Sequence, residues 1–123
     1  MEQAKTIVVV EDDELIRLLV ETLLADEGYR TVGLASGVKT VETVKSTHAA
    51  LVITDLAMPG CSGLTVIEAM RADAETRDTP ILVVSAHTSW LDQHDHPQVQ
   101  GVLSKPFDLD ELVSLVNGVI GGN

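Results

Sequence analysis

The chain has 123 residues, 45% of them hydrophobic, and 8 Lys and Arg against 19 Asp and Glu give a formal charge of −11. This length makes one domain that needs no disulfide or metal staple. The single cysteine, Cys61, excludes an internal disulfide and is typical of the cytoplasm. The acidic surface disfavours direct nucleic-acid binding, because it would repel a phosphate backbone. No apolar run approaches the roughly 20 residues that cross a bilayer, and MEQAKTIVVV lacks the features of a signal peptide. We therefore expect a cytoplasmic protein with no membrane insertion.

The first half of the chain alternates β-rich runs with helical patterns. The β-branched run at 7–10 predicts a strand buried on both faces. Apolar residues at helical spacing from 15 to 24 predict a helix that stops at Gly28. Residues 29–34 predict a second strand, and the valines spaced by three in 37–45 predict a helix that depends on packing. The run LVIT at 51–54 predicts the third strand.

The second half continues this alternation, with one poorly patterned stretch. Helical spacing at 64–71, a polar loop at 72–79, and β-rich runs at 81–84 and 102–103 predict a helix and two strands. An Asp-x-x-Glu capping box, Asp108 to Glu111, predicts the start of the last helix. Between 86 and 104 the helical pattern is weak and Pro97 would interrupt it, so we expect a short or irregular fourth helix. His94 and His96 lie in this stretch, and without a nearby cysteine they favour a solvated loop over a transition-metal site.

Five strand–helix alternations predict the fold class. They indicate an α/β domain built on a single five-stranded parallel sheet, with helices on both faces and right-handed crossovers. Within it, the segment LVITDLAMPGCSG at 51–63 presents Asp55 at the end of a strand. Strand interiors disfavour aspartate, and the Pro59-Gly60 turn that follows enforces a reversal. Open α/β sheets bind their ligands at this end of the strands.

Four of the five predicted strands end on a residue capable of chemistry. These ends share one edge of a parallel sheet, so we expect their side chains to converge. Clustered carboxylates repel one another unless a cation lies among them, and hard oxygen ligands suit Mg²⁺. An ammonium group and a hydroxyl beside them complete what is needed to hold a phosphoryl group during transfer. The strand-end residues are Glu11, Asp12, Asp55, Ser85 and Lys105.

Taken singly, these residues have ordinary structural interpretations. An Asx-type turn would account for Asp55, a solvated surface position for Lys105, and a strand-end cap for Ser85. Acidic residues also favour the first turn of a helix, an interpretation that suits Asp13 and Glu14 better than the acids before them. The combination, in order and at strand ends, favours a functional site.

Four motifs give the chain a family resemblance. They are VVVEDDE at 8–14, DLAMPGCSG at 55–63, VVSA at 83–86 and LSKPF at 103–107. With them the chain resembles a response-regulator receiver domain of two-component signalling over essentially all of its length. The resemblance implies a flavodoxin-like (βα)₅ fold with strand order 2-1-3-4-5. It also implies a receiver domain spanning 1–123 with no output domain.

The resemblance implies a role for each acid at the strand ends. Asp55 matches the phospho-accepting aspartate. Asp12 matches a direct ligand of Mg²⁺ (or Mn²⁺), and Glu11 matches the acid that holds the metal through water. Asp55 also contributes to the metal, and Ala57 would supply a backbone carbonyl.

The remaining matches concern the phosphoryl group itself. Ser85 matches the hydroxyl residue that moves towards it, and Lys105 the lysine that pairs with it; the Lys105–Pro106 bond matches one that is usually cis. The implied partner is a sensor histidine kinase or a histidine phosphotransfer protein, whose phosphohistidine is attacked by Asp55 to give an acyl phosphate. Hydrolysis later resets the switch, so the chain is not expected to turn over a free substrate as an enzyme does.

The chain departs from the family pattern at one face. Val102 stands where an aromatic usually swings inward on phosphorylation, and this residue and the irregular 86–100 segment both belong to the face where the family docks its partners. The hypothesis is that signalling uses another surface or rearranges that segment. Two alternative functions remain: a degenerate receiver that only binds proteins, and a Mg²⁺-dependent aspartyl-phosphate phosphatase. The phosphatase would need an acid where Ala57 stands.

Overall fold

The fold is a five-stranded parallel sheet covered by helices on both faces. The computed structural model describes residues 4–58, 62–86 and 99–121. The strand order is β2-β1-β3-β4-β5, which confirms the predicted α/β class and its 2-1-3-4-5 order. The strands are β1 (Thr6–Val10), β2 (Arg30–Leu34), β3 (Leu51–Thr54), β4 (Ile81–Ser85) and β5 (Gly101–Ser104).

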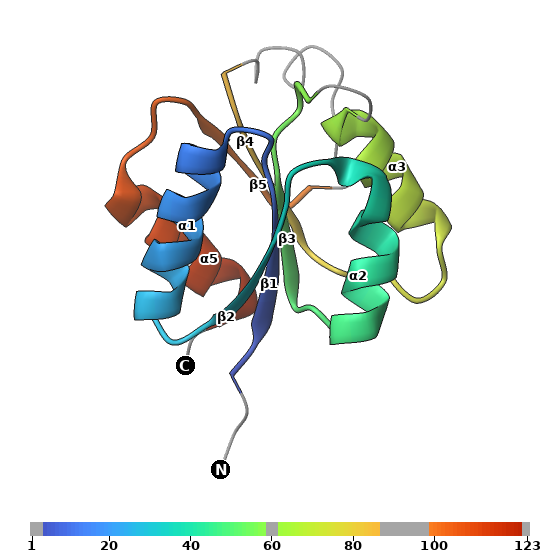
Figure 1. Cartoon of the computed structure of the whole chain (residues 1–123). Helices are drawn as coiled ribbons and strands as arrows, with labels where there is room; N and C mark the ends of the chain where they lie inside the picture. Colours follow the sequence, from blue (N-terminus) through green and yellow to red (C-terminus); the bar gives the residue numbers. More distant parts are fainter. Residues whose placement is uncertain (1–3, 59–61, 87–98, 122–123) are drawn as a thin grey trace.

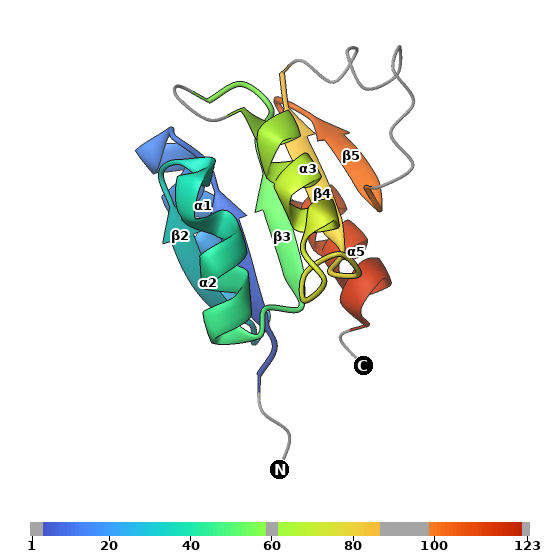
Figure 2. The same ribbon diagram turned by 90° about the vertical axis from the view of Figure 1, so that its right-hand side faces the viewer.

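Among the described residues, two pairs of helices enclose the sheet. The helices α1 (Glu14–Asp26) and α5 (Leu109–Ile120) cover one face, and α2 (Thr40–Thr47) and α3 (Gly63–Ala72) cover the other (Figure 1). Turned by 90°, the view shows α2 and α3 lying in front of the strands (Figure 2). None of the helices in the described ranges has the length and apolar character needed to cross a bilayer.

The core is built from aliphatic side chains because the chain has only three aromatics. On the α1 and α5 face, Leu24, Leu112 and Val116 pack against β1, β3 and β4. On the other face, Ile67 and Met70 of α3 pack against the alternate residues of the same strands. All four residues of β3 and all five of β4 are buried, as is usual for the central strands of a parallel sheet covered on both faces.

The register brings the carboxyl ends of the strands together. Val10 pairs with Leu34 of β2 and with Thr54 of β3, and Ser85 pairs with Ser104 of β5. The residues that follow these positions therefore emerge along one edge of the sheet.

Side-chain caps fix where the helices begin. Asp13, which the sequence placed at a helix N-terminus, is the N-cap of α1 and accepts a hydrogen bond from the Ile16 amide (3.1 Å). At α5, Asp108 is the N-cap as predicted, and its carboxylate accepts from the Asp110 amide (2.8 Å). Gly28 ends α1 with a positive φ of 98°, a conformation that glycine adopts without steric cost.

The helix predicted at 37–45 differs from the one observed. Residues Gly37–Lys39 form a 3₁₀ turn, η1, and α2 begins only at Thr40. The cause is local side-chain bonding: the Ser36 hydroxyl accepts from the Val38 amide (3.3 Å), and the Thr40 hydroxyl donates to the Gly37 carbonyl (2.9 Å). Such bonds compete with the α-helical pattern.

Some sequence predictions fall on residues outside the described ranges. Most of the stretch in which a short or irregular fourth helix is expected, including Pro97, falls in residues 87–98. His94 and His96 lie in the same residues, and Cys61 lies in residues 59–61. The irregular helix and the solvated loop at the two histidines therefore stay predictions.

Candidate functional site

Three carboxylates meet at the strand ends. Glu11 and Asp12 follow β1 and Asp55 follows β3, and one carboxylate oxygen from each lies within 4.8 Å of the others. Glu11 and Asp55 are only 5% and 6% exposed, whereas Asp12 is exposed. The cluster is therefore a recessed acidic site that opens to solvent on the side of Asp12.

Lys105 supplies the positive charge of the site. Its Nζ donates to Glu11 Oε1 and to Asp55 Oδ2, each at 2.8 Å. Lys105 follows β5, and its amide donates to the Ser85 carbonyl (3.0 Å), which fixes it beside the end of β4. Its peptide bond to Pro106 is cis, as the resemblance implied. One ammonium group thus bridges the acids contributed by two different strands.

The pKa values of the two buried acids are shifted in opposite directions. Burial raises the pKa of Glu11, and the nearby Asp55 charge adds to this, so its pKa stays above the ordinary value despite the bond from Lys105. Burial also raises the pKa of Asp55, but hydrogen bonds from Lys105 and Ser85 outweigh it and the pKa is lowered overall. Burial lowers the pKa of Lys105, yet its bonds to both acids leave it raised. Asp55 is therefore held as an ionised carboxylate.

Further contacts fix the orientation of the Asp55 carboxylate. The Ala57 amide donates to Asp55 Oδ1 (3.3 Å), so this residue presents its N–H to the site. Ser85 is fully buried at the end of β4 and bonds to the same carboxylate. Both oxygens of Asp55 are thus oriented by the protein before any ligand arrives.

Gly63 allows α3 to approach the end of β3. Its amide donates to the Leu56 carbonyl (2.8 Å). A Cβ at this position would lie 2.1 Å from the Asp55 carbonyl oxygen and 2.8 Å from the Leu56 Cα. Backbone atoms cannot move aside as a flexible side chain can, so glycine is required here. The helical spacing predicted at 64–71 begins directly after Gly63 and does not reveal this requirement.

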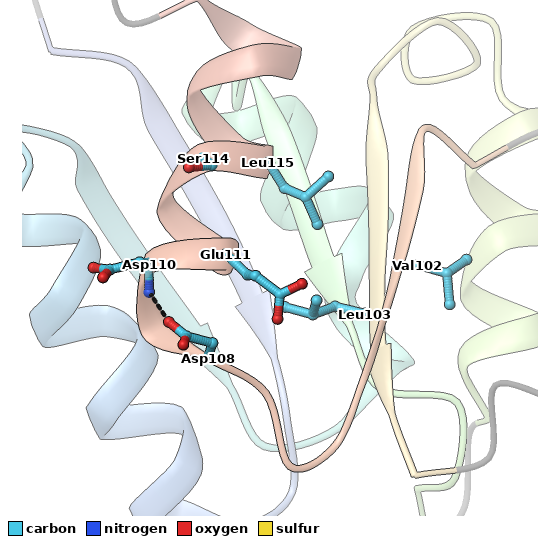
Figure 3. A pocket seen from close by; sticks show the side chains of 7 residues that line it. All are labelled: Val102, Leu103, Asp108, Asp110, Glu111, Ser114 and Leu115. Carbon is cyan, nitrogen blue, oxygen red and sulfur yellow. Dashed lines mark hydrogen bonds between the residues drawn. The ribbon is translucent and has the colours of Figure 1, made fainter.

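Val102 lines a pocket to which none of the acidic-site residues contributes. It is 38% exposed on β5 and lines this pocket with Leu103, Leu115 and acidic side chains of α5 and its cap. Its side chain points to the opposite side of β5 from α5 (Figure 3). The structure therefore brings together the predicted acids, Ser85 and Lys105, with the Ala57 backbone beside them. It places Val102 outside that group.

The donor set fits a small divalent cation. Three carboxylates and one ammonium group leave a formal charge of −3 + 1 = −2 at the site. Oxygen ligands of this kind suit Mg²⁺, which binds through one or two carboxylates and keeps several of its waters. The exposed side of Asp12 leaves space for those waters.

Comparisons with known proteins agree with this geometry. The family model for the response regulator receiver domain matches residues 7–117. The polar-differentiation response regulator DivK of Brucella ovis is 28% identical over 119 residues, covering 95% of this chain and 97% of DivK.

Solved structures show the same likeness. A sensor protein from Polaromonas sp. JS666 is 30% identical, with a TM-score of 0.88 over 94% of this chain and 95% of its own. The receiver domain of sensor histidine kinase PA1611 from Pseudomonas aeruginosa PAO1, solved with a magnesium ion coordinated in its active site cleft, is 26% identical, with a TM-score of 0.86 over 96% and 98%. The chain therefore belongs to the response regulator receiver domain family of two-component signalling.

Proposed function

We propose that this chain is a phosphorylatable signalling switch in which Asp55 accepts a phosphoryl group from a phosphohistidine. The donor is a sensor histidine kinase or a histidine phosphotransfer protein. The observation that carries the proposal is the Asp55 carboxylate itself, bonded to Lys105 at 2.8 Å and grouped with two more acids.

Asp55 has the properties of the nucleophile in this reaction. Its lowered pKa keeps the carboxylate ionised at neutral pH. In the transfer, a bond forms between an Asp55 oxygen and phosphorus while the bond from phosphorus to the donor imidazole nitrogen breaks, leaving a neutral imidazole once that nitrogen is protonated. The product is an acyl phosphate on Asp55.

The acidic cluster is the proposed site for Mg²⁺ or Mn²⁺. Asp12 and Asp55 would bind the ion directly, Glu11 through water, and Ala57 through its carbonyl. When bound, the ion supplies positive charge that offsets the charge of the transferring phosphoryl group. The magnesium in the PA1611 receiver domain supports this assignment.

Lys105 and Ser85 are proposed to hold the transferred group. The Lys105 ammonium already contacts the oxygen Asp55 Oδ2, so it lies where a phosphoryl oxygen would develop negative charge. The Ser85 hydroxyl bonds to the same carboxylate and is positioned to donate to the phosphoryl group. Hydrolysis of the acyl phosphate then resets the switch, without turnover of a free substrate.

The donor protein is proposed to dock on α1. Asp55 is recessed, so a phosphohistidine has to enter from the strand ends, beside the start of α1. There α1 exposes three leucines, Leu15 (80%), Leu18 (49%) and Leu19 (47%). Exposed apolar groups at helical spacing form a surface on which an apolar helical face of the donor can pack.

Intact mass measurement tests the proposal. The chain is incubated with acetyl phosphate and Mg²⁺, and Asp55→Asn is the matched control. We expect one phosphoryl adduct on the wild type and none on the variant. A wild type without the adduct would overturn the phosphorylation proposal and leave the binding-module alternative. The phosphatase alternative gains no support, because the residue two positions after Asp55 is Ala57.

A further inference from the structure

Arg17 of α1 reaches back to the acidic turn that follows β1. Its Nη1 donates to the backbone carbonyl oxygen of Glu11 at 2.8 Å, and its side chain is 18% exposed. The acidic site itself does not include Arg17, and the proposed chemistry gives it no role.

The carbonyl that Arg17 holds belongs to the peptide unit joining Glu11 to Asp12. Because a peptide unit is planar and rigid, its orientation sets the directions in which these two neighbouring side chains leave the backbone. The other groups of Glu11 are also tied: its amide donates to the Leu34 carbonyl (2.9 Å), Oε2 accepts from the Asp13 amide (3.1 Å), and Oε1 accepts from Lys105. Arg17 is the contact that fixes the carbonyl.

A short chain of polar contacts holds Arg17 in place. Its Nε lies 4.0 Å from Glu21 Oε2, one turn along α1, and the Thr31 hydroxyl of β2 donates to Glu21 Oε1 (3.3 Å). Gly33 provides the space beneath them: a Cβ there would lie 2.3 Å from Glu21 Oε2 and 3.1 Å from the Arg17 Cδ. The contacts therefore run from Thr31 through Glu21 and Arg17 to the Glu11 carbonyl.

An arginine that binds backbone carbonyls is not by itself functional. Arg71 does the same in the loop between α3 and β4, where its Nη1 donates to the carbonyls of Arg77 (2.9 Å) and Thr79 (2.7 Å). That loop precedes β4 and so lies at the opposite edge of the sheet from the acidic site. Arg17 differs from Arg71 in the carbonyl that it binds, which is that of Glu11 in the acidic site.

We propose that Arg17 is a positioning residue for divalent-cation binding. It fixes the Glu11–Asp12 peptide unit so that the carboxylates of both residues face the cation with the correct geometry before it arrives. The inference rests on the proposed metal site. Groups that orient metal ligands from outside the ligand shell typically change metal affinity by about 10–100-fold when they are removed. We expect the lower end, about tenfold, because Glu11 keeps its other contacts.

The test measures binding of Mn²⁺ alone, by the electron paramagnetic resonance signal of the free ion, alongside unfolding in urea. Arg17→Met keeps the apolar stem and removes the donors, so it should weaken Mn²⁺ binding about tenfold. Arg17→Lys should recover part of the affinity, because an ammonium group can still donate to the carbonyl. Arg71→Met is the matched control, because it likewise removes an arginine that donates to backbone carbonyls. It should lower stability while leaving Mn²⁺ affinity unchanged.

The outcomes separate this inference from the proposed function. A wild type that binds no Mn²⁺ would overturn the metal site itself. A wild type that binds, with Arg17→Met binding equally well, would overturn only the role of Arg17. Equal weakening in Arg71→Met would also overturn it, because affinity would then follow general stability. If Arg17→Met does not fold, Mn²⁺ binding is measured for Glu21→Gln instead, since Glu21 contacts Arg17. This variant should also bind Mn²⁺ more weakly than the wild type. An unchanged Mn²⁺ affinity would refute the inference.

Discussion

Replacing Lys105 with methionine tests how the acidic site balances its charges. In the metal-free protein the substitution removes two charge-assisted hydrogen bonds of 2.8 Å and leaves Glu11 and Asp55 recessed without a counter-charge. Breaking a buried ion pair by removing one partner costs about 3–5 kcal/mol. The Lys105 side chain is 17% exposed, so solvent screens part of the interaction and the lower end, about 3 kcal/mol, is expected.

The assay is urea unfolding near neutral pH, with and without Mg²⁺. Lys45→Met is the matched control, because Lys45 also bridges two acids, Asp73 (2.6 Å) and Glu75 (3.5 Å), but does so on the surface. The control should lose little stability. Mg²⁺ should stabilise Lys105→Met more than it stabilises the wild type, because the variant carries one more uncompensated negative charge. A loss below about 1 kcal/mol, or an equal Mg²⁺ effect in both proteins, would refute this reasoning.

Three further predictions concern other parts of the site. The folded pKa of Glu11 lies above its ordinary value of 4.5, so the free energy of unfolding of the metal-free protein should fall as the pH rises from 4.5 through the folded pKa. Glu11→Gln should flatten this part of the pH profile and should also weaken Mg²⁺ binding. An unchanged pH profile would contradict this assignment of the raised pKa. Gly63→Ala should destabilise the chain by about 1–3 kcal/mol in urea unfolding and slow phosphorylation by acetyl phosphate, because the new Cβ meets the Asp55 backbone; unchanged stability would show that the turn can move aside. Leu18→Glu should reduce phosphotransfer from a histidine-phosphorylated donor protein several-fold while leaving phosphorylation by acetyl phosphate unchanged, and equal loss with both donors would argue against docking on α1.

The general form of the site could be predicted from the sequence because it depends on topology. Once five strands alternate with helices, the strands run parallel and their carboxyl ends share an edge, so Asp55 and Lys105 meet although they lie far apart along the chain. Strand ends are also marked locally, by an acid or a lysine directly after a β-rich run. The fold class and the convergence of the predicted site residues followed from these two features.

The residues that support the site could not be predicted in the same way. An arginine on the first turns of a helix looks like any surface arginine, and only the three-dimensional path of its side chain shows that Arg17 holds the Glu11 carbonyl. The need for glycine at position 63 depends on how closely α3 approaches the end of β3. The 3₁₀ turn at η1 depends on the hydroxyls of Ser36 and Thr40, which the spacing of apolar residues does not report.

The two buried acids show how one ammonium group can give neighbouring carboxylates different roles. Lys105 bonds to both at the same distance, yet the pKa of Asp55 is lowered and that of Glu11 is raised. The difference comes from what else each acid receives: Asp55 also accepts from Ser85 and from the Ala57 amide, whereas besides Lys105 Glu11 accepts from the Asp13 amide and faces the negative charge of Asp55. The hydrogen-bond donors therefore keep Asp55 ionised, as its proposed role as nucleophile requires, whereas burial dominates the pKa of Glu11. A divalent cation bound among the three acids would offset the repulsion between the neighbouring charges of Glu11 and Asp55, and would therefore lower the raised pKa of Glu11.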